Sequence, residues 1–134
     1  MVAFSIPIRV YIEDTDAGGI VYYANYLKFM ERARTEWLRS LGVELDQWQD
    51  QHRTLFVVRA LNIEYLSPGK FNDQLQATLL PTVIKRASLS CEQAIMRSAE
   101  VLSASTVQLV CVNADTLAPQ AIPKSIREAM TFEH

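Results

Sequence analysis

The sequence is poor in the residues from which many catalytic and metal sites are built. Its 134 residues include only two histidines and two cysteines. Cys91 and Cys111 lie in strand-like runs at a spacing that matches neither a disulfide framework nor a zinc site, so both are expected to be buried packing residues. His134 is the last residue and is expected to be disordered, and polar neighbours place His52 in a solvated loop. Neither a histidine-activated nucleophile nor a zinc site is expected.

Long apolar runs, an excess of one charge and the common catalytic motifs are also absent. No segment holds 18 consecutive apolar residues, and residues 1–13 alternate in polarity, unlike a signal peptide. The net charge of −2 argues against a nucleic-acid surface, although a local cationic spot for a phosphorylated ligand stays open. The sequence contains no G-x-S-x-G, H-E-x-x-H or glycine-rich phosphate motif. We therefore expect a cytoplasmic protein whose hydrolytic chemistry, if any, depends on a carboxylate.

The composition is that of an ordinary globular chain, with 49% hydrophobic and 21% charged residues. We expect residues 1–134 to form one domain that needs no disulfide to fold. Apolar residues alternate from Phe4 to Ile12, which predicts a strand, and Pro7 places that strand at a sheet edge or at a bulge. Helical spacing predicts one long helix over Tyr26–Leu41, with Asn25 as its N-cap and Gly42 just beyond its end.

The remainder of the chain has the pattern of consecutive strands. Strands are predicted over residues 55–66, 74–84, 85–96 and 101–112, with short helices over 44–51 and 125–130. Strands that follow one another without helices pair in antiparallel fashion, so we expect an α+β fold in which a sheet of about five strands curls around the long helix. A bare sheet face or edge strand would favour dimerisation.

A loop with the sequence DTDAGGIV precedes the long helix and holds the candidate catalytic groups. A carboxylate there, Asp14 or Asp16, would lie near helix N–H groups that can stabilise a carbonyl oxygen as it becomes an oxyanion. Gly18 and Gly19 would let the backbone approach a ligand closely. The same spacing also occurs in simple capping and turns. With Glu13 the loop has three acids, but the rest of a calcium loop is missing.

Residues 11–42, YIEDTDAGGIVYYANYLKFMERARTEWLRSLG, closely resemble the signature of the 4-hydroxybenzoyl-CoA thioesterase-like hot-dog proteins. The match is nearest to YbgC-type acyl-CoA thioesterases associated with the Tol–Pal system of Gram-negative bacteria, and it continues through residues 56–73, 101–113 and 122–126. The resemblance implies a hot-dog fold, dimers with a continuous sheet that commonly form tetramers, and hydrolysis of an acyl-CoA to free acid and CoA.

The resemblance also assigns roles to residues. Asp16 would be the catalytic carboxylate, as nucleophile or general base, in an active site at the dimer interface. The backbone N–H near Tyr23 would polarise the thioester carbonyl. YbgC-type proteins often have histidine where this chain has Tyr23, so only the backbone role carries over. No cofactor or metal is expected, because CoA is part of the substrate.

Substrate-binding candidates are basic and apolar residues of the strands. Four basic residues are candidates for the CoA phosphates: Lys85 and Arg86 at the start of a predicted strand, with Lys70 and Arg59 as further contributors. Solvated surface charge is the alternative for each. Val57, Val58 and Tyr65 are candidates for the acyl pocket, with plain sheet core as the alternative.

Two other functions remain open. The chain could be a weakly catalytic partner of acyl carrier protein or of phospholipid-synthesis enzymes. A dehydratase acting on β-hydroxyacyl thioesters is less well supported, because that chemistry usually needs a histidine. The sequence does not fix the acyl group.

Overall fold

The computed structural model describes residues 3–132, so His134 lies outside the described residues. The helices are α1 (Tyr23–Ser40), α2 (Leu45–His52) and α3 (Lys124–Phe132), and a 3-10 turn, η1, spans Ile12–Asp14. The strands are β1 (Phe4–Arg9), β2 (Thr54–Tyr65), β3 (Gln74–Ile84), β4 (Ser88–Arg97) and β5 (Glu100–Asn113).

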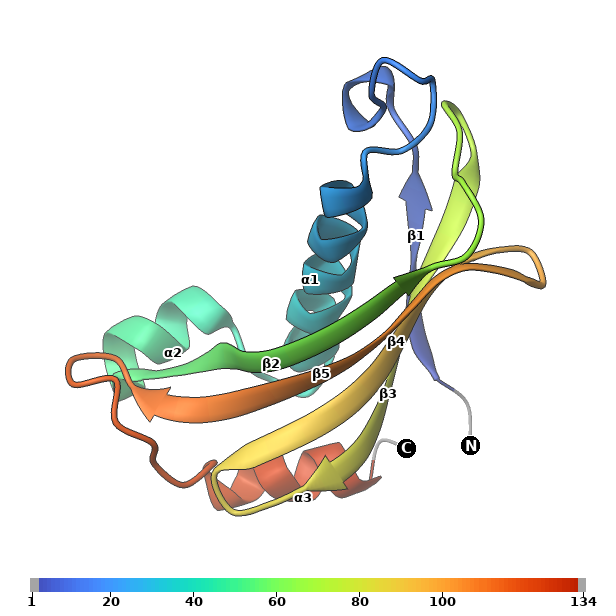
Figure 1. The fold of residues 1–134 in the computed structure, drawn as a ribbon. Helices are drawn as coiled ribbons and strands as arrows, with labels where there is room; N and C mark the ends of the chain where they lie inside the picture. The colour runs from blue at the N-terminus through green and yellow to red at the C-terminus, as the bar shows by residue number, and fades with distance from the viewer. Residues whose placement is uncertain (1–2, 133–134) are drawn as a thin grey trace.

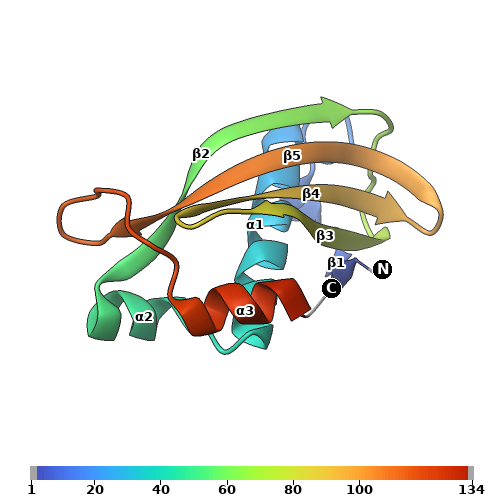
Figure 2. The same cartoon turned by 90° about the horizontal axis from the view of Figure 1, so that it is seen from below.

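The five strands form one antiparallel sheet in the order β1-β3-β4-β5-β2. The sheet curls around α1, which lies against its concave face (Figure 1, Figure 2). The predicted α+β arrangement, with about five strands around one long helix, is therefore confirmed. β1 is an edge strand, as Pro7 predicts, because a residue without an N–H can occupy an edge strand at little loss of ladder hydrogen bonding.

The sequence predicted the long helix correctly but placed its start three residues too late. α1 begins at Tyr23 with Tyr22 as its N-cap, and Asn25 is not the cap. The side chain of Asn25 instead donates from Nδ2 to the backbone carbonyl of Asp14, at 2.8 Å. A contact to a residue outside the helix thus outweighs the local capping preference.

The other end of α1 follows the prediction. Gly42 has a φ of 93°, a conformation that favours glycine, and it follows the C-cap residue. The N–H groups of Gly42 and Val43 donate to the carbonyls of Arg39 and Leu38, at 3.0 and 2.9 Å. These bonds satisfy carbonyls that the helix end would otherwise leave free.

The predicted strand over residues 85–96 also needs correction at its start. Lys85 and Arg86 lie in the turn between β3 and β4, and β4 begins at Ser88. The N–H of Lys85 donates to the carbonyl of Ser88 at 2.8 Å, which closes the hairpin. Local polarity did not reveal where the chain reverses.

The core is built from one stripe of α1 and the inward side chains of the sheet. Tyr26, Phe29, Met30 and Ala33 belong to one buried cluster of this stripe, and Trp37 belongs to the other, which also takes in residues of α3. No helix within residues 3–132 is long and apolar enough to span a membrane.

Both cysteines are buried, as predicted. Burial raises the pKa of Cys91 and of Cys111 to about 11, so both remain protonated thiols near neutral pH.

A polar cluster is buried between α1 and the sheet. Nη1 of Arg34, a residue that is 7% exposed, donates to Oε1 of Gln93 at 2.8 Å. Its Nη2 lies 2.6 Å from Oε2 of Glu31. Gln93 is 2% exposed and donates from Nε2 to the carbonyl of Met30 at 2.9 Å. Each buried group therefore has a partner.

Candidate active site

The two loop acids have different surroundings. Oδ2 of Asp14 accepts the N–H of Tyr11 at 2.8 Å, which caps the 3-10 turn η1. The backbone carbonyl of Asp14 accepts the N–H of Tyr22 at 2.9 Å and the side-chain amide of Asn25. Asp14 therefore helps to hold the loop in shape, through one carboxylate oxygen and its backbone carbonyl.

Asp16 sits in a tight reversal that leaves one carboxylate oxygen available. Its N–H donates to the carbonyl of Ile20 at 2.9 Å, and its carbonyl accepts the N–H of Gly19 at 3.0 Å. Its Oδ1 accepts the N–H of Gly18 at 2.8 Å, whereas its Oδ2 makes no hydrogen bond within residues 3–132. The residue is exposed, so this second oxygen is free to react or to accept a proton.

Both predicted glycines are needed for this reversal. Gly19 has a φ of 79°, which an L side chain rarely adopts. A Cβ on Gly18 would lie 3.2 Å from Oδ1 of Asp16 and would press on the carboxylate. The glycines thus act by shaping the turn around Asp16.

The N-terminus of α1 follows this loop directly. The N-cap Tyr22 makes no side-chain capping hydrogen bond, and the first turn of the helix contains no acidic residue. The N–H of Tyr23, the first residue of the helix, is therefore not occupied by a cap. About half a positive charge is concentrated at such a helix end. The arrangement combines a carboxylate with hydrogen-bond donors aimed away from the helix.

An aromatic groove borders the loop and the helix start. Its volume is about 330 Å³, and it is lined by Ile20, Val21, Tyr23, Tyr26, Tyr65, Leu66, Ser67 and Pro68. The ring of Tyr65 lies 5.9 Å from that of Tyr23 and 5.6 Å from that of Tyr26, between centroids. This groove is large and apolar enough for a small acyl group.

The tyrosines around this groove favour their neutral form. Burial raises the pKa of Tyr26 and, with help from the neighbouring phenols, that of Tyr65. Repulsion from Tyr23 raises the pKa of Tyr22, with a smaller contribution from the carboxylate of Asp16. The groove therefore presents neutral aromatic surface beside the acid.

The two valines predicted to line an acyl pocket, Val57 and Val58, lie in the first half of β2, away from the aromatic groove. They point to different faces of the sheet. Val57 pairs with Val110 and Val58 with Leu109, so the two valines point to opposite sides of the sheet. Val58 lines a small cavity of about 160 Å³ against α1, together with residues that include Arg34. Within one chain this cavity is separate from the aromatic groove.

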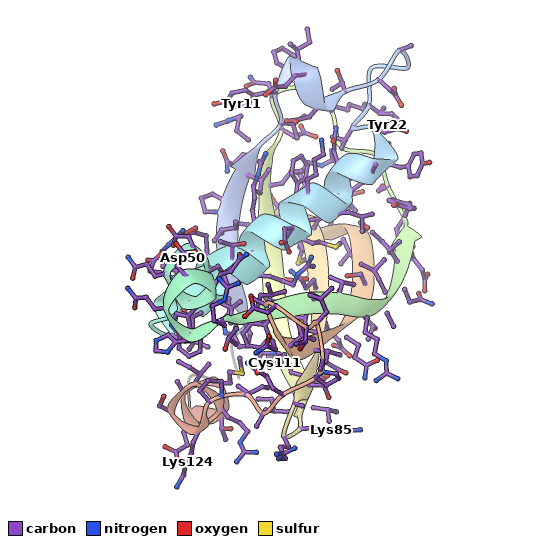
Figure 3. All side chains as sticks on the ribbon, turned by 90° about the vertical axis from the view of Figure 1, so that its left-hand side faces the viewer. Tyr11, Tyr22, Asp50, Lys85, Cys111 and Lys124 are labelled. Atoms are coloured by element: carbon purple, nitrogen blue, oxygen red, sulfur yellow. The ribbon has the colours of Figure 1, made fainter. Side chains whose placement is uncertain are left out.

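The predicted phosphate-binding residues are also spread out. Lys70 pairs with Ile20 in a short antiparallel bridge beside the Asp16 loop. Arg59 lies at an irregularity of β2, between Val58 and Ala60. Lys85 lies at the opposite end of the molecule from Tyr22 (Figure 3). β3 connects these ends, and its 11 residues span about 35 Å.

Arg86 neighbours Lys85 in the same turn, so a single chain does not bring this pair to Asp16. Among residues 3–132, no group of three or more histidine, cysteine, aspartate or glutamate side chains is arranged to hold a metal ion.

Sequence reasoning missed two residues of the site. Asn25 fastens the loop to the helix through the carbonyl of Asp14. The hydroxyl of Tyr26 accepts the N–H of Gly69 at 2.9 Å, which fastens the segment after β2 to the same helix turn. The available signal in the sequence was the pair Asn25 and Tyr26 in the first helical turn. Nothing in the neighbouring sequence indicates that the partner of Tyr26 lies 43 positions away.

Thioesterases are among the known proteins that are similar to this chain. The sequence model of the thioesterase-like superfamily matches residues 10–130. The YbgC acyl-CoA thioesterase of Haemophilus influenzae is 43% identical over 98% of this chain and 95% of that protein. A probable thioesterase from Bartonella henselae is 30% identical, with a TM-score of 0.79 over 90% of this chain and 98% of its own.

A second solved structure is similar in fold. The 1,4-dihydroxy-2-naphthoyl-CoA thioesterase from Synechocystis has a TM-score of 0.90 and 23% identity, and the match covers 99% of each chain. These structures confirm the fold expected from the resemblance. The chain therefore belongs to the thioesterase-like superfamily, with YbgC-type acyl-CoA thioesterases among its relatives.

Proposed function

We propose that this chain hydrolyses an acyl-CoA thioester to a free acid and CoA, with Asp16 as the catalytic carboxylate. The observation that carries the proposal is the exposed carboxylate of Asp16, whose Oδ2 makes no hydrogen bond within residues 3–132, next to the N-terminus of α1, where Tyr22 makes no side-chain capping hydrogen bond. The match to acyl-CoA thioesterases over nearly the whole chain supports the substrate class.

Two routes lead to the same products. In the first, an oxygen of Asp16 attacks the carbonyl carbon, the C–S bond breaks, the CoA thiolate leaves and takes a proton, and water then hydrolyses the acyl–aspartate anhydride. In the second, Asp16 takes a proton from a water molecule, whose oxygen attacks the same carbon; the C–S bond then breaks, and the CoA thiolate leaves and takes up the proton. In both, the N–H of Tyr23 stabilises the negative charge that forms on the carbonyl oxygen.

The active site is proposed to be completed by a second copy of the chain. Asp16 is exposed, and Lys85 and Arg86 lie too far away to serve the same site within one chain. β2 is a sheet edge of 12 residues, which offers unpaired backbone groups to another strand. The proposal is that two chains join along β2 into a continuous sheet and that such dimers form homotetramers. The loop would then be shielded from water, and Lys85 and Arg86 would meet the CoA phosphates.

Several finer predictions from the sequence belong to this proposal. They are one domain over residues 1–134, a cytoplasmic location, association with the Tol–Pal system and the absence of any cofactor beyond the CoA of the substrate. The alternative role, as a weakly catalytic partner of acyl carrier protein or phospholipid-synthesis enzymes, also stays a prediction.

A hydrolysis screen tests the activity. Short aliphatic, long aliphatic and aromatic CoA esters, and the corresponding acyl carrier protein thioesters, are each incubated with the purified chain, and product release is followed. We expect turnover of at least one CoA ester, because the carboxylate and the helix N–H groups suffice for a thioester. Negligible turnover across the panel, together with stable capture of acyl carrier protein, would favour the partner role.

Dilution tests whether the site needs two chains. We expect light scattering to give two or four times the chain mass of 15.2 kDa, and specific activity to fall as dilution releases single chains. The fall should reverse when the sample is concentrated again. Constant specific activity in a sample that scattering shows to be monomeric would contradict the shared site.

A further inference from the structure

Hydrogen bonds hold the Asp16 loop to the first turn of α1 from both of its halves, an incoming limb (residues 14–16) and an outgoing limb (residues 20–21). On the incoming limb, Asn25 holds the carbonyl of Asp14. On the outgoing limb, the N–H of Val21 donates to the carbonyl of Gly69 at 2.8 Å, and the N–H of Gly69 donates to the hydroxyl of Tyr26 at 2.9 Å. Two consecutive residues of the helix, Asn25 and Tyr26, therefore help to position the loop, together with the N-cap Tyr22, whose N–H donates to the same carbonyl of Asp14 at 2.9 Å.

Hydrogen bonds connect Gly69 to Asp16 across three short segments. Val21 pairs with Thr15, and Ile20 pairs with Lys70, in isolated antiparallel bridges. The N–H of Asp16 donates to the carbonyl of Ile20 at 2.9 Å. A shift of residues 69–70 would therefore be transmitted through residues 20–21 to the backbone of Asp16.

The segment after β2 is anchored on its other side by charged groups. Arg97 lies 2.7 Å from Oδ2 of Asp73, and the same oxygen accepts the N–H of Lys70 at 2.9 Å. Arg97 also pairs with Glu100, whose other oxygen accepts the hydroxyl of Ser67 at 2.8 Å. These contacts hold the segment in place, and among residues 3–132 the hydrogen bond between Gly69 and the hydroxyl of Tyr26 connects it to α1.

Packing at Gly69 is close. A Cβ there would lie 3.0 Å from Cγ2 of Val21 and 3.4 Å from the hydroxyl of Tyr26. A side chain would have to push the outgoing limb of the loop away from the helix. The residue at this position therefore helps to set the distance between the loop and α1.

We propose that the hydroxyl of Tyr26 is a positioning group for catalysis. Tyr26 and the N–H of Tyr23 that would stabilise the oxyanion belong to the same turn of α1, so the helix fixes their relative position. Through Gly69 and Val21 the hydroxyl fixes the backbone that carries Asp16 relative to that N–H. Tyr26 thereby sets the geometry of the carboxylate and the oxyanion donor without touching the reacting atoms.

The hydroxyl can be separated from the rest of the side chain. Tyr26 is 3% exposed, and its ring packs against Phe29 and Tyr65 with centroids 6.3 and 5.6 Å apart. Phenylalanine would keep this packing and lose only the acceptor for the N–H of Gly69. The inference rests on the proposed hydrolysis by Asp16.

The test compares Tyr26→Phe with the unmodified protein on a CoA ester that the latter hydrolyses. We expect kcat to fall by about 10- to 100-fold, because a misplacement of about 1 Å can have that effect. KM should change by no more than about threefold, since the substrate contacts remain. Amide hydrogen exchange should accelerate at Gly69 and Val21, while amides at the far end of the sheet stay protected. Gly69→Ala keeps the hydroxyl but displaces Val21, and it should lower kcat in the same way.

Thr78→Val is the matched control for a lost hydroxyl that accepts a backbone N–H. Oγ1 of Thr78, in β3, accepts the N–H of Ala94 at 3.1 Å and donates to the carbonyl of Ala94 at 3.4 Å. This variant should lose thermal stability while retaining kcat at a temperature where all variants are folded. An equal fall of kcat in Thr78→Val and Tyr26→Phe would mean that Tyr26 contributes only to stability.

The outcomes separate the positioning role from the proposed function. If the unmodified protein hydrolyses a CoA ester and Tyr26→Phe retains its kcat, the positioning role is wrong and the thioesterase proposal stands. If the unmodified protein hydrolyses nothing in the panel, the proposed function fails and the positioning role fails with it.

Discussion

Replacing Asp16 with asparagine is expected to lower kcat for acyl-CoA hydrolysis by about 10²- to 10⁴-fold, the usual contribution of a positioned acid–base group. The amide can neither attack the thioester nor take a proton from water. It can still accept the N–H of Gly18 through Oδ1, so the turn should persist. Steady-state kinetics and urea unfolding of Asp16→Asn check both parts of this expectation.

Asp46→Asn is the matched control. Asp46 also accepts a nearby backbone N–H through Oδ1, that of Gln47 at 2.9 Å, but it lies in α2 rather than in the loop. We expect this variant to keep its activity and its free energy of unfolding, since exposed substitutions usually change stability by less than about 0.5 kcal/mol. Near-normal hydrolysis by Asp16→Asn would remove Asp16 from the mechanism, whatever the control shows.

The second large effect concerns stability. Gln93→Leu should lower the free energy of unfolding by about 3 kcal/mol, because it removes the acceptor of a buried guanidinium. Among residues 3–132, Arg34 would then retain the ion pair with Glu31, whose side chain is 60% exposed and therefore a weak partner. Leucine fills a similar volume, so the loss reports on the polar contact rather than on a cavity. Urea unfolding with an unchanged m-value would give the difference directly.

A double-mutant cycle tests whether the loss comes from the Arg34–Gln93 contact. Replacing both residues with leucine removes the buried charge together with its acceptor. The double variant should therefore be more stable than the sum of the single losses predicts, by about 1–3 kcal/mol. Gln76→Leu, at an exposed position of the same sheet, serves as the control and should change little. Strict additivity in the cycle would mean that the contact contributes no stability of its own.

Sequence reasoning predicted what depends on neighbouring residues. Alternation and helical spacing predicted the type and order of the five strands and three α-helices but not the 3-10 turn η1, and Gly42 marked the end of α1 because its φ is set locally. It placed the start of α1 wrongly, since Asn25 bonds to Asp14 across the loop. Sequence reasoning also placed Lys85 in a strand. The position of a hairpin turn depends on which residues of the two strands pair, and the polarity of the residues alone does not show this pairing.

The candidate site was predictable to a similar extent. The composition of DTDAGGIV indicates a shaped acidic loop, but the division of labour between its two acids needs three-dimensional geometry. Oδ2 of Asp14 accepts the N–H of Tyr11 at the start of the 3-10 turn, whereas Oδ1 of Asp16 accepts that of Gly18 within the loop, and Asp16 is the more exposed of the two. The contact between Tyr26 and Gly69 joins segments far apart in the chain, so no local pattern contains it.

The burial of the two cysteines has a practical consequence. Cys91 and Cys111 are the only sulfhydryl groups that the polypeptide contributes, and each is shielded and fully protonated near neutral pH. Thiolates, not thiols, react with disulfide reagents such as Ellman's compound. Colour that develops in a turnover mixture therefore originates from liberated coenzyme, and the enzyme can be used at high concentration against slow substrates without raising the background.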